Sequence, residues 1–313
     1  MLKRLGWEVC LYMKTLYKFI FLTVIISSVF YFALNRLSIP TTEKVSQPLI
    51  QQENQYMRES NPLQNNVGIC VENSLPFHDH SNTEISKQGE WHLIWQDEFE
   101  NNCLDSNNWN IEDWAAEKNN ELQYYSPNNV KVEDGLLKLI SKNEKFKGRE
   151  YTSGAVQSKG KFNFLYGKAE MRAKLPAGQG VFPAFWMMPE KEDTWLPEID
   201  ILEMLGHKPN EIWMVLHWLD TNGSLKSDYS IFIGPDFSKD FHIFSIEWTP
   251  DSITWFIDGI EQFKSNKFIP NENMYLYLNT AIGGDWPGSP DDTTVFPVIY
   301  EIDYVRVFQR HDE

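Results

Sequence analysis

Cysteine is scarce in this chain of 313 residues, which has only three: Cys10, Cys70 and Cys103. None of them has the spacing to another cysteine or histidine that is typical of zinc or iron–sulfur sites. Cys10 precedes a hydrophobic segment, whereas Cys70 and Cys103 follow it. If that later part is exported to an oxidising compartment, Cys70 and Cys103 can form one disulfide, and two free thiols are the alternative.

Positive charge is also in short supply. The chain has 28 Lys and Arg residues against 44 Asp and Glu residues, which gives a net charge of −16. Long-range repulsion opposes encounter with nucleic acid and with polyanionic polysaccharides. The composition therefore argues against nucleic acid and favours a neutral partner such as an uncharged glycan, although solubility alone also accounts for the charge.

Helical periodicity is missing from residue 91 onward, and strands do not alternate with helices there. Short segments alternate apolar with polar residues and are separated by turn signals. Asp134-Gly135 and Asp258-Gly259 are typical hairpin turns, and each lies between two such segments. These features predict an all-β fold, a jelly-roll β-sandwich of two antiparallel sheets with a concave substrate cleft.

One long hydrophobic run does occur, near the amino terminus. Residues 19–34 carry no charge, and a group of basic residues precedes them. Such a run indicates a signal anchor or a secretory signal peptide. The basic residues before it place the amino terminus in the cytoplasm. Under either reading the rest of the chain lies outside the cytoplasm, anchored to a membrane or, if the segment is cleaved, secreted or periplasmic.

The organisation of the whole chain follows from these segments. A stretch rich in Gln, Asn, Ser, Thr, Glu and Pro separates the hydrophobic run from the strand-rich part, and we expect it to be a largely irregular linker. The predicted divisions are a basic cytoplasmic amino terminus (1–18), a hydrophobic segment (19–37), a polar linker (38–88) and a strand-rich domain (89–310).

The most informative stretch is Glu198-Ile199-Asp200-Ile201-Leu202-Glu203, which holds three acids within six residues. Its apolar and β-branched residues indicate a strand, where side chains alternate between two faces. Glu198 and Asp200 therefore share a face, whereas Glu203, at an odd offset, points to the other one. A β-bulge near Ile201-Leu202 would bring Glu203 back to the face of the other two acids.

Carboxyl groups gathered in this way suit the hydrolysis of a glycosidic bond. That reaction uses one carboxylate as the nucleophile and one carboxylic acid as the proton donor, and a separation of about 5–5.5 Å marks the retaining mechanism. Asp200 beside the nucleophile would influence its ionisation. An exposed edge strand with solvated acids is the structural alternative.

The part of the chain from about residue 91 to 309 resembles glycoside hydrolase family 16, in its laminarinase-like branch. Matching blocks occur in one order on both sides of the carboxylate motif. They are WQDEF (95–99), NNELQYY (119–125), YTSG (151–154), YGKAEMR (166–172), LPAGQG (175–180), PAFWM (183–187), HW (217–218), GGDWPG (283–288) and DYVRV (303–307).

The resemblance implies endo-hydrolysis of β-1,3-glucan or mixed β-1,3-1,4-glucan with retention. It makes Glu198 the nucleophile, Asp200 its assistant and Glu203 the general acid/base, whose pKa must be raised for this task. Alternatives with the same fold are a galactanase that acts on agarose or carrageenan, a glucan transglycosylase, and a non-catalytic glucan-binding module. Pro197, where laminarinases more often have Gly, is a departure from the pattern.

The resemblance also implies a set of substrate-binding residues. Trp186 corresponds to a platform for a sugar ring, and His217 is expected on a neighbouring strand near Glu203. The full predicted set is Asn120 (with Asn119 as an equal contender), Arg172, Trp186, His217 and Trp286. Core packing is the alternative for the two tryptophans, and a structural ion pair is the alternative for Arg172.

No cofactor is expected for catalysis, but the resemblance implies one structural calcium ion away from the catalytic residues. Its candidate ligands are the Glu98 carboxylate, the Gly135 carbonyl and the Asp303 carboxylate, all oxygen donors that suit a hard cation. The ion would hold the two ends of the domain together, and an ordinary surface ion pair is the alternative for Asp303. We expect a monomer.

Overall fold

The computed structural model describes residues 69–70, 90–191 and 194–310. The chain separates into two units, 1–62 and 63–313, and the described residues all belong to the second. The predicted cytoplasmic terminus, the hydrophobic segment and most of the linker lie outside the described residues. Among the described residues there is no helix long and apolar enough to cross a membrane.

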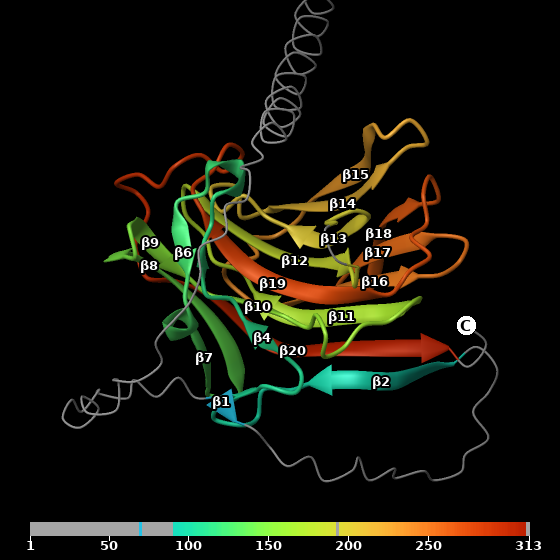
Figure 1. Ribbon diagram of the computed structural model, residues 1–313, viewed down its shortest axis with the longest axis horizontal. Coiled ribbons are helices and arrows are strands. Elements are labelled where there is room, and N and C mark those ends of the chain that lie inside the picture. The colour runs from blue at the N-terminus through green and yellow to red at the C-terminus, as the bar shows by residue number, and fades with distance from the viewer. Residues whose placement is uncertain (1–68, 71–89, 192–193, 311–313) are drawn as a thin grey trace, which may run out of the picture. The chain divides into compact units, whose positions relative to one another are not determined.

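Two sheets account for almost all of the described structure, which confirms the predicted all-β sandwich (Figure 1). The first sheet has seven strands and carries the three acids. In spatial order its strands are β15 (Leu225–Ile233), β14 (Glu211–Leu219), β13 (Glu198–Glu203), β12 (Val181–Pro189), β19 (Met274–Ile282), β10 (Ala155–Gln157) and β4 (Asn110–Ile111).

The second sheet has eleven strands. In spatial order they are β18 (Ile260–Ser265), β17 (Ile253–Ile257), β16 (His242–Trp248), β11 (Gly167–Lys174), β20 (Val298–Arg310), β8 (Leu136–Phe146), β9 (Arg149–Ser153), β6 (Gln123–Tyr125) and β5 (Trp114–Ala115), with β2 (Trp91–Asp97) paired to β20 and β7 (Val130–Glu133) paired to β8. The pairs are antiparallel except β6 with β9, which run parallel. Two 3-10 turns complete this part, η1 (Lys118–Asn120) and η2 (Pro127–Asn129).

Both predicted hairpin turns are present. Asp134 and Gly135 join β7 to β8 with φ values of 58° and 71°, and Asp258 and Gly259 join β17 to β18 with φ values of 51° and 74°. Two successive positive φ angles are characteristic of a type I′ turn, whose twist matches that of the flanking strands. The aspartate-glycine pairs therefore fix the register of these hairpins locally.

The core lies between the two sheets, and strand alternation shows how the sequence builds it. On β11, Ala169, Met171 and Ala173 are fully buried, whereas the charged residues between them point away from the core. On β13, Ile199 and Leu202 are likewise fully buried. Apolar residues at alternating positions bury one face of each strand, and this burial is the main favourable contribution to folding.

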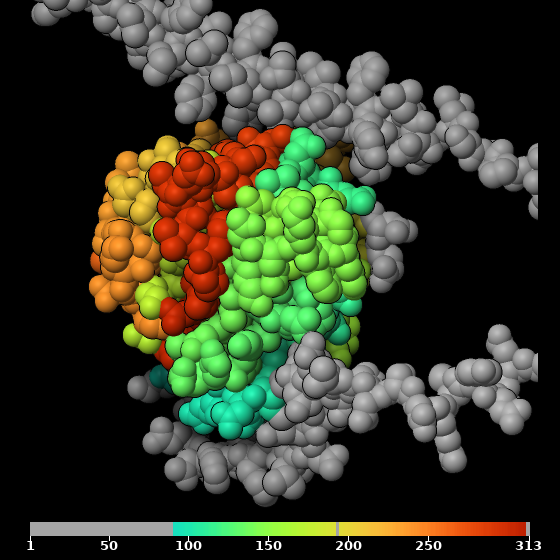
Figure 2. All heavy atoms as spheres, turned by 90° about the vertical axis from the view of Figure 1, so that its left-hand side faces the viewer, coloured from blue at the N-terminus to red at the C-terminus, as the bar shows by residue number. Residues whose placement is uncertain are grey.

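The strand order brings distant segments together. β20, near the end of the chain, pairs with β11 along one edge and with β8 and then β2 along the other. Figure 2 shows the same arrangement on one face of the molecule, where C-terminal residues (red) lie between orange and green segments. β2 and β20, the first and last strands of the sandwich in sequence, are therefore neighbours in one sheet.

One short element falls within the segment predicted to be an irregular linker. β1 (Ile69–Cys70) pairs in parallel with β3 (Leu104–Asp105), and Cys70 lies opposite Asp105 in that register. Cys103, next to β3, is disulfide-bonded. A free thiol at Cys103, one of the two readings of the sequence, is therefore wrong.

Candidate active site

The predicted bulge in β13 is present and lies where the spacing of the acids requires it. Opposite β14, Asp200 pairs with Val215 and Glu203 pairs with Trp213, so Ile201 and Leu202 together face a single intervening residue. The register against β12 shifts at the same place. Because Ile201 and Leu202 are both buried in the core, Glu203 returns to the face that carries the other two acids. We call this outward face of the seven-stranded sheet the site face.

Burial governs the electrostatics of the three carboxyl groups. It raises the pKa of Glu203 to about 8. It also raises the pKa of Glu198 well above its usual value, with a further rise from Glu203 and an opposing contribution from the positive charge of Lys118. The pKa of Asp200 is raised by burial and then by the charges of the two glutamates. Like charges in a poorly solvated place cannot all ionise together, so near neutral pH the group holds at least one proton.

His217 lies on β14, the strand next to the acids, as predicted. It pairs with Glu198, however, and not with Glu203, and its Nε2 is 3.7 Å from Oδ2 of Asp200. Its Nδ1 is 2.6 Å from the Ser227 hydroxyl oxygen on β15. Burial lowers the pKa of His217 to about 4, so the imidazole is neutral near neutral pH. The position beside Glu203 on β14 belongs to Trp213.

Trp186 occupies the site face next to Asp200, as its predicted role requires. It pairs with Asp200 across β12 and β13, and its indole Nε1 donates a hydrogen bond of 2.8 Å to Oδ1 of Asn279. Asn279 in turn donates to the Tyr125 hydroxyl at 2.9 Å. The indole also packs against the Tyr277 ring, with 4.8 Å between ring centroids. Its orientation is thus fixed by one hydrogen bond and one aromatic contact.

Trp286 belongs to a second aromatic group, at the Glu203 end of the acids. Its ring lies edge-on to Trp213 and to Phe182, with centroid distances of 5.1 Å in both cases. Trp213 stacks in turn on Tyr229 of β15 at 5.6 Å. Trp286 is 41% exposed and Tyr229 is 50% exposed, so their rings remain accessible. The core-packing alternative therefore does not describe Trp286.

Asn120 lies in η1, and its side chain is engaged by the loop that carries Trp286. Its amide donates a hydrogen bond of 2.8 Å to Oδ1 of Asp285, while the Asn119 carbonyl accepts one of 2.9 Å from the Asp285 amide. Both asparagines have positive φ angles, 55° and 56°. The pair therefore ties two loops together near the acids, and Lys118 of the same turn is the cation that acts on Glu198.

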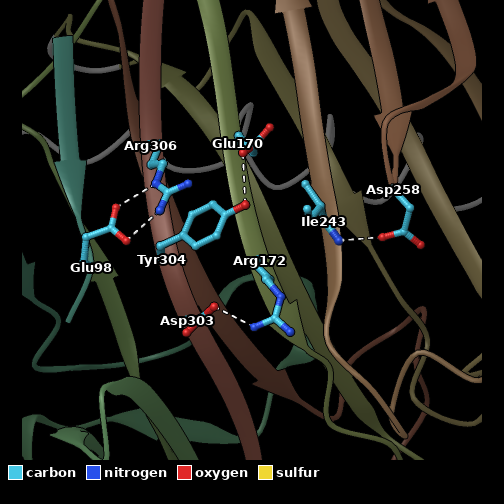
Figure 3. Close-up of polar contacts among 8 residues, drawn as sticks. All are labelled: Glu98, Glu170, Arg172, Ile243, Asp258, Asp303, Tyr304 and Arg306. Carbon is cyan, nitrogen blue, oxygen red and sulfur yellow. Dashed lines mark hydrogen bonds and ion pairs between the residues drawn. The ribbon is translucent and has the colours of Figure 1, made fainter. Parts of the chain in front are cut away.

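Arg172 is not near the acids, so the prediction that it contacts substrate is wrong. It lies on β11 in the eleven-stranded sheet, on the face turned away from the core, where its guanidinium forms an ion pair of 2.6 Å with Asp303 (Figure 3). It also lies over the Phe241 ring at 4.8 Å. The structural ion pair, which the sequence left open, is therefore what the structure contains.

The same ion pair bears on the predicted calcium ligands. The Asp303 carboxylate is bound by Arg172, and both oxygens of Glu98 are bound by Arg306, at 2.7 and 2.8 Å (Figure 3). A guanidinium fork satisfies a carboxylate as a cation does, so these two ligands do not fit a calcium site as they stand. Gly135, the third predicted ligand, lies in the β7–β8 turn. The Glu98–Arg306 pair itself joins the end of β2 to β20, the task that was expected of the ion.

Several residues at the site were not found from the sequence. Lys118 and Ser227 act on the site through Glu198 and His217, and Asn279 holds Trp186. Trp255, on the other sheet, donates a buried hydrogen bond of 2.9 Å to the backbone carbonyl of Asp200 at the bulge. Only Asn279 carries a signal in the sequence, because Asn279 and Thr280 are polar residues within a strand that is otherwise apolar or aromatic.

Comparisons with known proteins show which family the chain belongs to. The family model described as glycosyl hydrolases family 16 matches residues 107–306, more than half of the chain. A second model, described as beta-glucan synthesis-associated protein SKN1/KRE6/Sbg1, matches residues 5–191. The two matches overlap in the first part of the sandwich.

Individual relatives point the same way. A beta-glucanase of Rhodothermus marinus is 34% identical over 255 residues, which cover 71% of this chain and 87% of that protein. A glucan endo-1,3-beta-glucosidase of Cryptopygus antarcticus is 35% identical, over 70% of this chain and 92% of that protein. The structure of the catalytic domain of a Thermotoga petrophila endo-1,3-beta-glucanase is 37% identical, with a TM-score of 0.66, over 71% of this chain and 99% of that one. The chain belongs to glycosyl hydrolases family 16.

Proposed function

We propose that this chain is an endo-acting β-glucanase that hydrolyses β-1,3 or mixed β-1,3-1,4 linkages with retention at the anomeric carbon. The observation that carries the proposal is the bulge in β13, because it places Glu198, Asp200 and Glu203 on one face of the sheet. The activities named for the relatives, an endo-1,3-beta-glucosidase among them, support the choice of linkage. The negative charge of the chain suits a neutral glucan.

The surroundings of the two glutamates support different roles for them. Burial raises the pKa of both carboxyl groups, but only Glu198 has a positive charge nearby that opposes this rise, that of Lys118. Burial keeps the proton on Glu203, whose pKa is raised to about 8, as a general acid requires. The shared burial keeps at least one proton in the group near neutral pH, and the order of the acids in the laminarinase-like motif indicates which glutamate attacks and which donates the proton. We therefore assign Glu198 as the nucleophile and Glu203 as the acid/base.

The reaction then proceeds in two displacements and needs no cofactor. Glu203 gives its proton to the glycosidic oxygen while the Glu198 carboxylate attacks C1, so the bond to the leaving sugar breaks and a glycosyl ester forms. Glu203, now ionised, takes a proton from water, and the resulting hydroxide attacks C1 and releases Glu198. Asp200 is the group whose charge and proton modulate Glu198 in both steps. Trp186 beside Asp200 offers a ring face for the sugar at the cleavage point.

The roles are separated by chemical rescue of two variants. Glu198→Gln is expected to lower kcat on laminarin on the order of 10⁴-fold, and Glu203→Gln about 10²- to 10⁴-fold. With an aryl β-glucan oligosaccharide and azide, Glu198→Ala should yield the α-glycosyl azide, whereas Glu203→Ala should yield the β-glycosyl azide. Asp251→Asn, at an exposed turn of the other sheet, is the matched control. Undiminished activity of Glu198→Gln, or the opposite anomers, would refute the assignment.

Linkage preference is decided by a panel of polysaccharides. We expect new reducing ends from laminarin or lichenan and none from agarose or carrageenan. Tight binding of laminarin with no product would instead indicate the non-catalytic module. Release from agarose alone would favour the galactanase.

A glucan transglycosylase is the second candidate, and the match to a beta-glucan synthesis-associated family favours it. The glycosyl ester of a retaining enzyme is open to attack by a sugar hydroxyl in place of water. The exposed rings of Trp286 and Tyr229 on the Glu203 side, where the leaving sugar departs, offer binding surface for such an acceptor. Products longer than the starting laminarin oligosaccharide, resolved by mass spectrometry, would distinguish this activity from hydrolysis.

We further propose that residues 19–37 anchor the chain in a membrane with the sandwich outside the cytoplasm. The support is the uncharged run preceded by basic residues. If the segment is cleaved, the enzyme is secreted or periplasmic. Cell fractionation with a carboxyl-terminal tag, followed by protease treatment of intact cells, tests both points. Sedimentation of the purified chain in detergent tests the expected monomer.

A further inference from the structure

Three donor atoms of two kinds converge on the site face. One carboxylate oxygen of Glu198, one of Asp200 and one ring nitrogen of His217 all lie within 4.8 Å of one another. This is the only group of three or more such side chains among residues 69–70, 90–191 and 194–310. Two oxygens and one imidazole nitrogen are a donor set that zinc accepts, whereas calcium and magnesium prefer oxygen alone.

An independent observation singles out Asp200 within this group. The residue is only 2% exposed, and its Oδ2 is buried without a hydrogen-bond partner, so water does not satisfy this atom either. A buried carboxylate oxygen without a donor is costly, and proteins rarely leave one in this state. The atom that it faces, Nε2 of His217 at 3.7 Å, is itself a possible acceptor. A cation between the two atoms would satisfy both.

The hydrogen bond of His217 prepares it for this task. Its Nδ1 is held by the Ser227 hydroxyl at 2.6 Å, which turns Nε2 toward Asp200. Histidines that bind metals are usually fixed by a hydrogen bond of the other ring nitrogen in this way. For a tetrahedral zinc ion with ligand bonds of about 2.0–2.1 Å, two ligand atoms stand about 3.4 Å apart. The observed 3.7 Å between Asp200 and His217 is only a few tenths of an ångström longer, whereas separations of up to 4.8 Å within the group require larger shifts.

We propose that Glu198, Asp200 and His217 form a binding site for a zinc-type divalent cation, and that the cation inhibits the enzyme by occupying the nucleophile. Two carboxylates and a dication are electrically neutral together, which relieves the repulsion between buried acids. While bound, the cation holds the Glu198 oxygen that would attack C1. Bound substrate and bound metal therefore exclude each other. The inhibitory part rests on the proposed hydrolase activity, whereas metal binding does not.

The test is titration of the full chain, first treated with chelator, with Zn²⁺ alone by calorimetry. Because His78 and His80 lie outside the described residues and also bind metals in principle, a His78→Ala/His80→Ala chain is the reference. We expect one Zn²⁺ per chain, and at least about 10-fold weaker binding after His217→Ala or Ser227→Ala. His217→Gln is the second variant should His217→Ala not fold. His242→Ala, a histidine paired with Asp258 on the other sheet, is the matched control.

Cobalt provides a second measurement. Co²⁺ in the site should give visible absorption bands of a four-coordinate ion, and these bands should vanish in Asp200→Asn. In assays on laminarin, Zn²⁺ should raise KM and leave kcat unchanged. Absence of Zn²⁺ binding to the reference chain, or equal affinity in the His217 variants, would overturn the site. If the His217 variants lose Zn²⁺ binding but Zn²⁺ does not inhibit the wild type competitively, only the inhibitory role is overturned. If the chain binds Zn²⁺ but has no activity on laminarin, only the proposed function is overturned.

Discussion

Replacing the Glu203 carboxyl by an amide should stabilise the protein at alkaline pH and change little at acidic pH. Burial raises the pKa of Glu203 from 4.5 to about 8. Between these two values the folded protein keeps a proton that the unfolded chain has released. The folded state then binds more protons, so the free energy of unfolding falls as the pH rises through this window. The stability that the protonated Glu203 carboxyl contributes is fully present below about pH 4.5, and it is lost above about pH 8.

The size of the effect follows from the same two values. Each tenfold change in proton affinity is worth about 1.4 kcal/mol, so the interval from 4.5 to about 8 corresponds to about 5 kcal/mol. Glu203 remains partly exposed on the site face, and the nearby solvent reduces the cost of its charge. We therefore expect the free energy of unfolding of Glu203→Gln to exceed that of the wild type by about 2–4 kcal/mol at about pH 8.5. Gln has nearly the same shape, so packing is preserved.

Urea unfolding followed by circular dichroism measures this difference. The wild type, Glu203→Gln and the exposed control Glu261→Gln are compared at about pH 5, 7 and 8.5, with the stability difference plotted against pH. The difference for Glu203→Gln should grow steadily over this range, while that for Glu261→Gln stays flat. A difference for Glu203→Gln that does not depend on pH would refute the reasoning, since it would mean that the carboxyl titrates alike in the folded and unfolded chain.

Three further changes probe the parts that support the site. Trp255→Phe removes the donor to the buried Asp200 carbonyl, and should cost about 1–3 kcal/mol of stability and lower kcat on laminarin. An unchanged kcat would show that the bulge keeps its geometry without this hydrogen bond. Glu98→Gln should weaken the fork to Arg306 by about 1 kcal/mol and lower Tm by a few degrees, whereas Ca²⁺ added to the chelator-treated wild type should leave Tm unchanged. A rise of Tm with Ca²⁺ would instead indicate a calcium ion at these carboxylates. Asn279→Ala leaves the indole and phenol that it bridges without partners, and should raise KM for laminarin without an equal loss of kcat.

Features that depend on local periodicity were predictable from the sequence. The alternation of residues along strands and the two aspartate-glycine turns were enough to predict a sandwich. The bulge was predictable for a different reason. In a regular strand Glu203 would point to the face opposite Glu198 and Asp200, whereas hydrolysis of a glycosidic bond requires the two glutamates on one face. The register at Asp200 and Glu203 confirms that inference.

Features that depend on contacts between distant strands were not predictable in this way. Arg172 lies in a strand whose alternation clearly puts it on a polar face, but alternation does not tell which of the two sheets the strand joins. Its sheet was fixed by pairing with β16 and β20, far along the chain. Ser227 and Trp255 reach the site for the same reason, through strands that no local pattern assigns to it.

The bulge also explains why so many acids are tolerated in one buried strand. A regular strand with the same sequence would send Glu203 into the core, among the apolar side chains that now surround Ile201 and Leu202. The extra residue leaves backbone groups unpaired in the sheet, and the carbonyl of Asp200 is satisfied from the opposite sheet by Trp255. The hydrogen bond that stabilises the bulge thus comes from the hydrophobic core, while the acids that the bulge aligns raise the free energy of the folded state. A site built in this way gains protonation states fit for catalysis at the expense of stability, and the alkaline gain in Glu203→Gln is the measure of that exchange.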